Sequence, residues 1–197
     1  MIIPGVDKVM KRSSPNTMST ENKSDKKQAN ITVRQYLQSA GFCGPASLKI
    51  LLSYFGKDFT EEQLAGLAHA TRDSGTEHEG MIEAVRKIDG YVFAKDGGSI
   101  TELEYFLTRE HLPVIIGWFD KDGDHYSVVV NITDKNIIIV DPAVNEPERW
   151  LDKETFPRIW FDFVGKENNI VSWCWYMVVS FEKKVYSVKD GRYYQPL

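Results

Sequence analysis

The 197-residue sequence is poor in cysteine and lacks any long apolar run. No segment approaches the roughly 18 consecutive apolar residues typical of a membrane-spanning helix. The N-terminal "MIIPGVDKVMKR" is too short and too charged for the core of a signal peptide. Two cysteines, Cys43 and Cys174, are too few for the disulfide framework of a small secreted scaffold. We therefore expect a cytoplasmic protein without a membrane span.

The chain also lacks the basic excess that is typical of nucleic-acid-binding proteins. It has 24 Lys and Arg against 28 Asp and Glu, and this net charge of -4 repels phosphate backbones. The basic excess is confined to residues 1–30, which are almost entirely polar after residue 11 and show no periodic apolar face to offset the entropy of ordering. We expect a flexible polar tail over 1–30, a single domain over 31–197, and no nucleic-acid partner.

Apolar residues recur with helical spacing through the first half of the chain. The pattern predicts a buried helix over 43–55, with Pro45 near its start and Gly56 after its end. Capping residues and first-turn carboxylates predict three further helices, at 58–70, 78–90 and 99–111.

After Pro113 the pattern changes to short β-branched and aromatic runs that are separated by polar turns. These runs predict strands at 114–119, 125–132, 136–141 and 173–181. Helices followed by strands, without βαβ alternation, indicate an α+β fold. In such a fold an N-terminal helical layer packs on a C-terminal antiparallel sheet.

Cys43 stands directly before a Gly-Pro step, at the start of the first predicted helix. Unpaired amides and the dipole at a helix N-terminus favour a thiolate, which is the nucleophilic form of cysteine. A cysteine nucleophile also needs a base, a group that orients the base, and hydrogen-bond donors for an oxyanion.

Among the four histidines, His125 is the candidate base. His69, His78 and His111 lie at the ends of predicted helices, where they suit surface or capping positions. His125 instead opens the strand "HYSVVVNI". A metal site formed by His69, His78 and Glu79 would need its ligands to converge from two helices, and we expect none.

Asp141 is the candidate orienting group. If Ile132 pairs with Asn136 across the short turn, His125 and Asp141 lie on the same sheet face, one diagonal step apart. Pro142 cannot donate to a strand ladder, so the strand should stop at Asp141 and leave its carboxylate at an accessible end.

Three segments together, "QSAGFCGPASLKILLSYFG", "HYSVVV" and a "DP" sixteen residues after the histidine, resemble the papain-like cysteine peptidases. The resemblance is strongest to the bacteriocin-leader (double-glycine) peptidases and their stand-alone relatives, over about residues 35–160. It implies a papain-like fold and a thiol hydrolase. By position, Cys43 would be the nucleophile, His125 the general base and later the acid, and Asp141 the residue that orients the imidazole.

The same resemblance implies that Gln38 supplies the side-chain amide of an oxyanion hole, beside the backbone N–H of Cys43. Papain-like enzymes usually place this glutamine six residues before the cysteine, whereas Gln38 is five before, and Gln35 is the other candidate. Leader peptidases of this kind are often fused to membrane exporters, and the sequence contains no transporter domain.

Three functions agree with this pattern. The first is a cysteine peptidase that acts on a peptide or protein without a cofactor. The second is an acyltransferase of the phytochelatin-synthase type, which would use the same acyl-enzyme. The third is a non-catalytic peptide-binding module on the same fold.

Cys174 lies in the apolar run "SWCWYMVV" and is interpreted as a thiol of a core strand.

Overall fold

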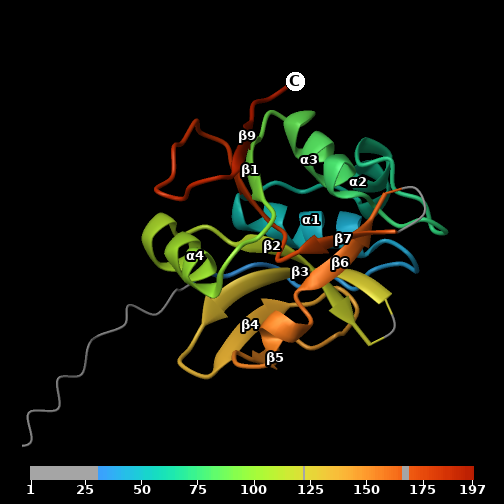
Figure 1. The fold of residues 1–197 in the computed structure, drawn as a ribbon. Coiled ribbons are helices and arrows are strands. Elements are labelled where there is room, and N and C mark those ends of the chain that lie inside the picture. Colours follow the sequence, from blue (N-terminus) through green and yellow to red (C-terminus); the bar gives the residue numbers. More distant parts are fainter. Residues whose placement is uncertain (1–30, 122, 166–168) are drawn as a thin grey trace, which may run out of the picture.

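The computed structural model describes residues 31–121, 123–165 and 169–197, so the tail expected over 1–30 lies outside the described residues. A seven-stranded antiparallel sheet crosses the molecule, with strand order β5-β4-β3-β2-β8-β1-β9, and helices pack on it (Figure 1). The α+β fold predicted from the sequence is confirmed. None of the helices in the described part of the chain is long and apolar enough to cross a membrane.

The helices and strands follow in a mixed order along the chain. The helices are α1 (Cys43–Tyr54), α2 (Glu61–Leu67), α3 (His78–Arg86) and α4 (Ile100–Tyr105), with a π-helical turn η1 (Phe106–Glu110) and a 3-10 turn η2 (Phe156–Arg158). The strands of the large sheet are β1 (Tyr91–Lys95), β2 (Val114–Asp120), β3 (Gly123–Ile132), β4 (Asn136–Val140), β5 (Arg149–Asp152), β8 (Tyr176–Ser180) and β9 (Arg192–Tyr194). A separate hairpin consists of β6 (Phe161–Val164) and β7 (Ile170–Trp173).

Local sequence explains where the helices begin. Helices α2 and α4 each start with a capping box, in which Thr60 pairs with Gln63 and Ser99 with Glu102. Helix α1 begins at Cys43 without a side-chain cap. The amides at its N-terminus are therefore not satisfied by a capping side chain.

Two apolar cores lie on opposite faces of the sheet. Helices α1, α2 and α3 cover one face, where residues such as Leu48, Leu51 and Met81 are fully buried. Helix α4, the π-helical turn and the segment around Phe156 and Trp160 cover the other. The sheet thus has an apolar layer on each side, and the edges and ends of its strands are left for polar chemistry.

The β3–β4 register has one irregularity. Near the turn Ile132 pairs with Ile137, not with Asn136, so the predicted pairing at that end is wrong by one residue. A bulge between Val129 and Asn131 absorbs the difference, and Val128 then pairs with Val140. The end of the hairpin that carries His125 and Asp141 therefore has the register that the prediction requires.

The sequence analysis missed part of the sheet. The first half of the chain contains β1 between α3 and α4, although only helices were predicted there. Strand β1 lies inside the sheet between β8 and β9.

Cys174 lies in a bend with φ 53° between β7 and β8 and is partly exposed, so its interpretation as a core strand thiol was wrong.

The β6–β7 hairpin is fixed to the rest of the fold by a buried pair of polar side chains. His78 Nε2 lies 2.7 Å from Asp162 Oδ2, and the two residues are 6% and 3% exposed. The His78 ring stacks on Trp175 with centroids 3.8 Å apart. His78 is therefore not the surface or capping residue that the sequence predicted.

Gly117 on β2 makes room for this pair. A Cβ at this position would lie 2.4 Å from Asp162 Oδ2 and 3.2 Å from His78 Nε2. We expect Gly117→Ala to displace the pair and to lower the free energy of unfolding by about 1–3 kcal/mol, the usual cost of overpacking. Urea unfolding measures the loss.

Gly123→Ala is the matched control on the neighbouring strand, because a Cβ there meets nothing within 4 Å. Its free energy of unfolding should stay close to that of the wild type. Equal losses in the two variants would show that the close approach at Gly117 does not constrain the fold.

Candidate active site

Cys43 is the first residue of α1, and its backbone N–H donates no hydrogen bond among the described residues. The next residue is Gly44, where a Cβ would lie only 2.7 Å from Thr76 Oγ1. The glycine therefore permits the loop around Thr76 to approach the helix. One turn later, Ser47 Oγ donates to the carbonyl oxygen of Tyr126 at 2.9 Å. This bond attaches α1 to the residue next to His125.

His125 interacts with two groups that favour its protonated form. Its Nε2 lies 2.7 Å from Asp141 Oδ1. The Cys43 thiol lies close enough to the ring to raise the pKa of the imidazole. Burial lowers the pKa of the imidazole, but the interactions with Asp141 and Cys43 outweigh burial and raise this pKa to about 9. The structure thus brings together three of the four predicted site residues.

Asp141 lies directly after β4 and has no exposed surface, so the accessible carboxylate predicted from the sequence is wrong. It is instead fully hydrogen-bonded. Oδ1 accepts from the backbone N–H of Ala143 at 2.9 Å as well as from His125, and Oδ2 accepts from Arg149 Nη1 at 2.8 Å. Burial raises the pKa of Asp141, but these hydrogen bonds lower it below its usual range, and the bond with His125 has the largest effect among them.

Arg149 on β5 extends the network, and the sequence analysis did not identify it. Its guanidinium donates to both oxygens of Asp120 at 2.8 Å and lies 5.0 Å from the Trp118 ring centroid. The hydrogen bond from Arg149 is the main cause that lowers the pKa of Asp120. Because Arg149 joins β2, β5 and the end of β4, no local pattern in the sequence signals it.

The two candidate glutamines occupy different places. Gln35 Nε2 donates to the carbonyl oxygen of Asp141 at 2.9 Å, so it fastens the chain beside the carboxylate. Gln38 is held through its backbone, whose N–H donates to Pro142 O at 2.8 Å. Its side-chain amide makes no hydrogen bond among the described residues, and Oε1 is buried without a partner there.

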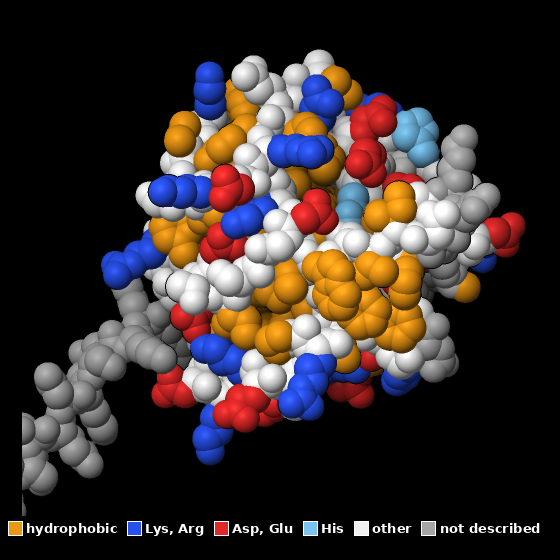
Figure 2. All heavy atoms as spheres, viewed as in Figure 1, with side chains coloured by type: hydrophobic (Ala, Val, Ile, Leu, Met, Phe, Trp, Pro, Cys, Tyr) orange, Lys and Arg blue, Asp and Glu red, His pale blue; other side chains and the backbone are white. Residues whose placement is uncertain are grey.

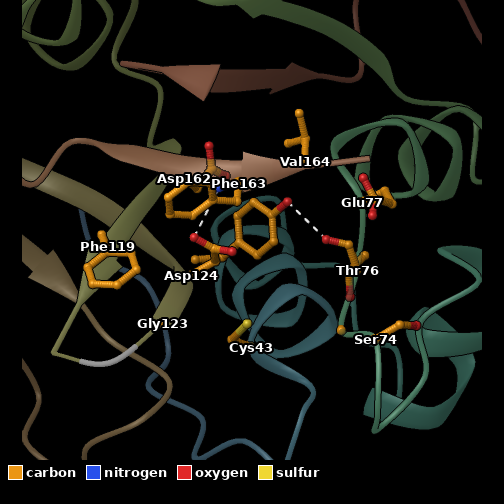
Figure 3. A pocket seen from close by; sticks show the side chains of 12 residues that line it. Cys43, Ser74, Thr76, Glu77, Phe119, Gly123, Asp124, Asp162, Phe163 and Val164 are labelled. Carbon is orange, nitrogen blue, oxygen red and sulfur yellow. Dashed lines mark hydrogen bonds between the residues drawn. The ribbon is translucent and has the colours of Figure 1, made fainter. Parts of the chain in front are cut away.

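Cys43 lies at the base of a cleft of about 470 Å³ (Figure 3). One wall is the loop at residues 74–77, and the opposite wall comes from the start of β3 and from β6. Tyr126 also lines the cleft, and its hydroxyl group donates to Thr76 O at 3.0 Å. A nucleophile, a paired histidine and an adjoining cleft make a site that can perform acyl transfer from a peptide bond.

The model of the peptidase C39 family matches residues 33–164. The chain belongs to this family. The match ends at β6, so the peptidase C39 region includes the Cys43, His125 and Asp141 positions but not β8 or β9.

Relatives of known sequence or structure agree with the C39 assignment. The chain is 31% identical over 121 residues to the pediocin PA-1 transport/processing ATP-binding protein PedD of Pediococcus acidilactici, covering 60% of this chain but only 16% of PedD. It is 38% identical over 110 residues to an uncharacterized protein of Methanothermobacter marburgensis, covering 54% of this chain and 70% of that protein.

The fold is similar to that of the peptidase domain of Streptococcus ComA, described as a bifunctional ABC transporter of a quorum-sensing pathway. The TM-score is 0.61 at 21% identity, and the match covers 76% of this chain and 98% of that domain. Together with the family match, this supports a cysteine peptidase of the C39 type.

The remaining candidates lie outside the C39 site. His69 is exposed and lies 3.4 Å from Glu83, and His111 is an exposed residue in the left-handed conformation after η1. Within residues 31–121, 123–165 and 169–197, no group of three or more His, Cys, Asp or Glu side chains is arranged to hold a metal ion. Cys43 and Cys174 are both free thiols.

Arg149→Met removes the donor that separates the Asp120 and Asp141 carboxylates. We expect a loss of about 2–3 kcal/mol in the free energy of unfolding near neutral pH, because a buried charge loses its partner. The folded-state pKa of each carboxyl is lowered, so the stability that each contributes is present above the unfolded pKa and is lost as the pH falls. The deficit should therefore shrink below about pH 4.

Arg158→Met is the control, because Arg158 is an exposed arginine on η2 whose side chain makes no hydrogen bond or ion pair within the described residues. Denaturant unfolding at several pH values gives both free energies. A deficit for Arg149→Met that matches the control, or that does not change with pH, would contradict the role given to this network.

Proposed function

We propose that the protein is a cysteine peptidase that hydrolyses peptide bonds through an acyl-enzyme on Cys43. The observation that carries the proposal is the position of His125, which is bonded to the buried Asp141 carboxylate and close enough to the Cys43 thiol for this group to raise the pKa of the imidazole. A structural histidine would need only one such partner, whereas a thiol hydrolase needs both.

In the first half-reaction the Cys43 thiolate attacks the carbonyl carbon of the peptide, and a tetrahedral oxyanion forms. His125, protonated because its pKa is raised to about 9, gives its proton to the leaving amine. The C–N bond breaks and the acyl group stays on the sulfur. Asp141 keeps the ring aligned through its bond to Nε2.

In the second half-reaction neutral His125 removes a proton from a water molecule, which attacks the thioester carbonyl carbon. The C–S bond then breaks, the carboxylic acid product leaves, and the proton returns to the Cys43–His125 pair. If an amine or thiol replaced water as the acceptor, the enzyme would be an acyltransferase. A product that forms only when such an acceptor is added would distinguish acyl transfer from hydrolysis.

The oxyanion needs donors that are not already engaged. Among the described residues, the backbone N–H of Cys43 at the start of α1 donates no hydrogen bond, and the Gln38 side chain has no partner. We assign both groups to the oxyanion hole, with Gln35 as the residue that supports the adjacent backbone. This assignment agrees with the hydrogen bonds that Gln35 already makes to Asp141 O and Val144 O.

Peptides are the substrate class that the relatives support. PedD is named for transport and processing, and the ComA domain is a peptidase domain. The present chain matches only 16% of PedD, so we propose proteolysis for it and do not propose the transport function.

Iodoacetamide labelling with peptide mapping tests the pair directly. Cys43 should be alkylated much faster than Cys174, also at mildly acidic pH, and His125→Ala should abolish the difference. Burial raises the pKa of Cys174, which makes it a slow internal reference. Cys43→Ala and His125→Ala should both abolish cleavage of a peptide mixture that is followed by mass spectrometry.

The pH dependence of kcat/KM gives a second readout of the same prediction. Protonated His125 is present below about pH 9 and lost above it, so kcat/KM should fall above that value. Asp141→Asn should move this fall to lower pH, because the carboxylate raises the pKa of the imidazole. Equal labelling of the two cysteines, or cleavage that survives Cys43→Ala, would refute the proposal.

Gln38→Ala tests the oxyanion assignment against its alternative. We expect kcat to fall about 10²–10³-fold with little change in KM, because the lost donor acts on charge that develops in the transition state. Gln35→Ala should instead lower stability through its lost backbone bonds. A larger loss of kcat in Gln35→Ala than in Gln38→Ala, at equal stability, would exchange the two assignments.

A further inference from the structure

The cleft beside Cys43 carries charge of one sign. Its described lining includes the carboxylates of Glu77, Asp124 and Asp162 and no Lys or Arg. The three residues come from both walls, so a group that enters the cleft passes between them (Figure 3).

Two of these carboxylates are held in place by backbone amides of β6 and of the residue that follows it. Asp124 Oδ1 accepts from the backbone N–H of Phe163 at 3.0 Å, and Glu77 Oε2 accepts from that of Gly165 at 3.1 Å. In each case one oxygen fixes the side chain, and the other has no partner among the described residues. The cleft therefore presents two positioned carboxylates, each with one oxygen that is open to a ligand.

The third carboxylate is almost completely buried. Asp162 is 3% exposed and pairs with His78 through Oδ2, while its buried Oδ1 has no hydrogen-bond partner in the described structure. A buried acceptor without a donor is costly and uncommon in folded proteins. An unsatisfied carboxylate oxygen on a residue that lines the cleft points to a donor that arrives with a ligand.

The carboxylates also repel one another. The pKa of Asp124 is raised, first by burial and also by the negative charges of Asp162 and Glu77, which outweigh the lowering effects of the Phe163 amide and of His78. A positive charge among the three would relieve this repulsion and supply hydrogen bonds at the same time.

Aromatic rings complete the cleft. Phe119 and Phe163 line it, and Phe119 stacks on Phe161, which in turn contacts Trp173 on β7. Figure 2 shows hydrophobic side chains gathered over the region of β6 and β7. Aromatic faces suit the apolar stem and the planar head of an arginine side chain, whereas they offer nothing to an acidic one.

We propose that this cleft binds a basic side chain of the substrate, arginine above all, next to the peptide bond that Cys43 attacks. The inference rests on the proposed peptidase function and narrows its substrate class to peptides with a cationic residue beside the cleavage point. The preference resides in Glu77, Asp124 and Asp162, which take no part in the chemical steps.

A matched pair of internally quenched peptides tests the preference. Cleavage of a peptide mixture first locates a cut site with an adjacent arginine, and the pair then carries either arginine or citrulline there. Citrulline has the shape of arginine without its charge. We expect kcat/KM to be about tenfold higher for arginine, a ratio that should fall as added salt screens the carboxylates.

Asp124→Asn and Glu77→Gln keep an acceptor for the Phe163 and Gly165 amides but remove the charge. Each should bring the arginine-to-citrulline ratio toward one. Glu79→Gln is the matched control, since Glu79 is an exposed carboxylate on α3 that does not line the cleft. It makes the same change in net charge and should leave the ratio as in the wild type.

Reaction of Cys43 with two charged thiol reagents tests the cleft without relying on turnover. Cationic trimethylammonioethyl methanethiosulfonate and anionic sulfonatoethyl methanethiosulfonate both form a mixed disulfide and release methanesulfinate. The cation-to-anion rate ratio at Cys43 should fall about threefold or more in Asp124→Asn and Glu77→Gln, because one nearby charge is lost. It should not change in Glu79→Gln.

The outcomes separate this inference from the peptidase function. Equal cleavage of the two peptides, with cleavage still dependent on Cys43, overturns the basic preference and leaves the peptidase intact. If no peptide is cleaved in a Cys43-dependent way, the peptidase function fails. In that case an unchanged reagent ratio in the two cleft variants also overturns the cationic site, and a reduced ratio supports it.

Discussion

A carboxylate with no exposed surface, Asp141, is the constraint on which the site depends. A buried charge is tolerated only when it is paired and hydrogen-bonded, and its partners here come from separate parts of the chain. His125 approaches from β3 and Arg149 from β5, while Gln35 binds the carbonyl oxygen of the same residue. The segment that leads into α1 and the strand that carries His125 are therefore both positioned by the Asp141 residue.

Much of this could be predicted because local sequence decides it. The start of α1 at Cys43, the capping residues Thr60 and Ser99 and the β-branched runs after Pro113 are signals within a few residues of one another. The family resemblance is now supported by the C39 match over residues 33–164. The roles of the site residues, including Gln38, remain predictions.

The parts that sequence analysis missed depend on contacts between distant residues. His78 binds Asp162 across 84 positions, and Arg149 meets Asp120 across 29. The burial of Asp141 depends on such contacts too, because pattern alone placed it at an accessible strand end. The register was correct at the site only through a bulge near Val130, which a period-2 pattern does not reveal.

Cys43 belongs to α1 and His125 to β3 of the sheet, so the packing between this helix and the sheet sets the distance between the thiol and the ring. The Ser47 hydroxyl on Tyr126 O is a spacer of fixed length in that packing. A change of side-chain volume in the core between α1 and β3 would therefore shift the sulfur relative to the imidazole before any strand unfolded. Loss of activity and unfolding are thus separable events in this molecule. A thermal scan that follows the signal of the sheet would detect the unfolding but not the loss of activity.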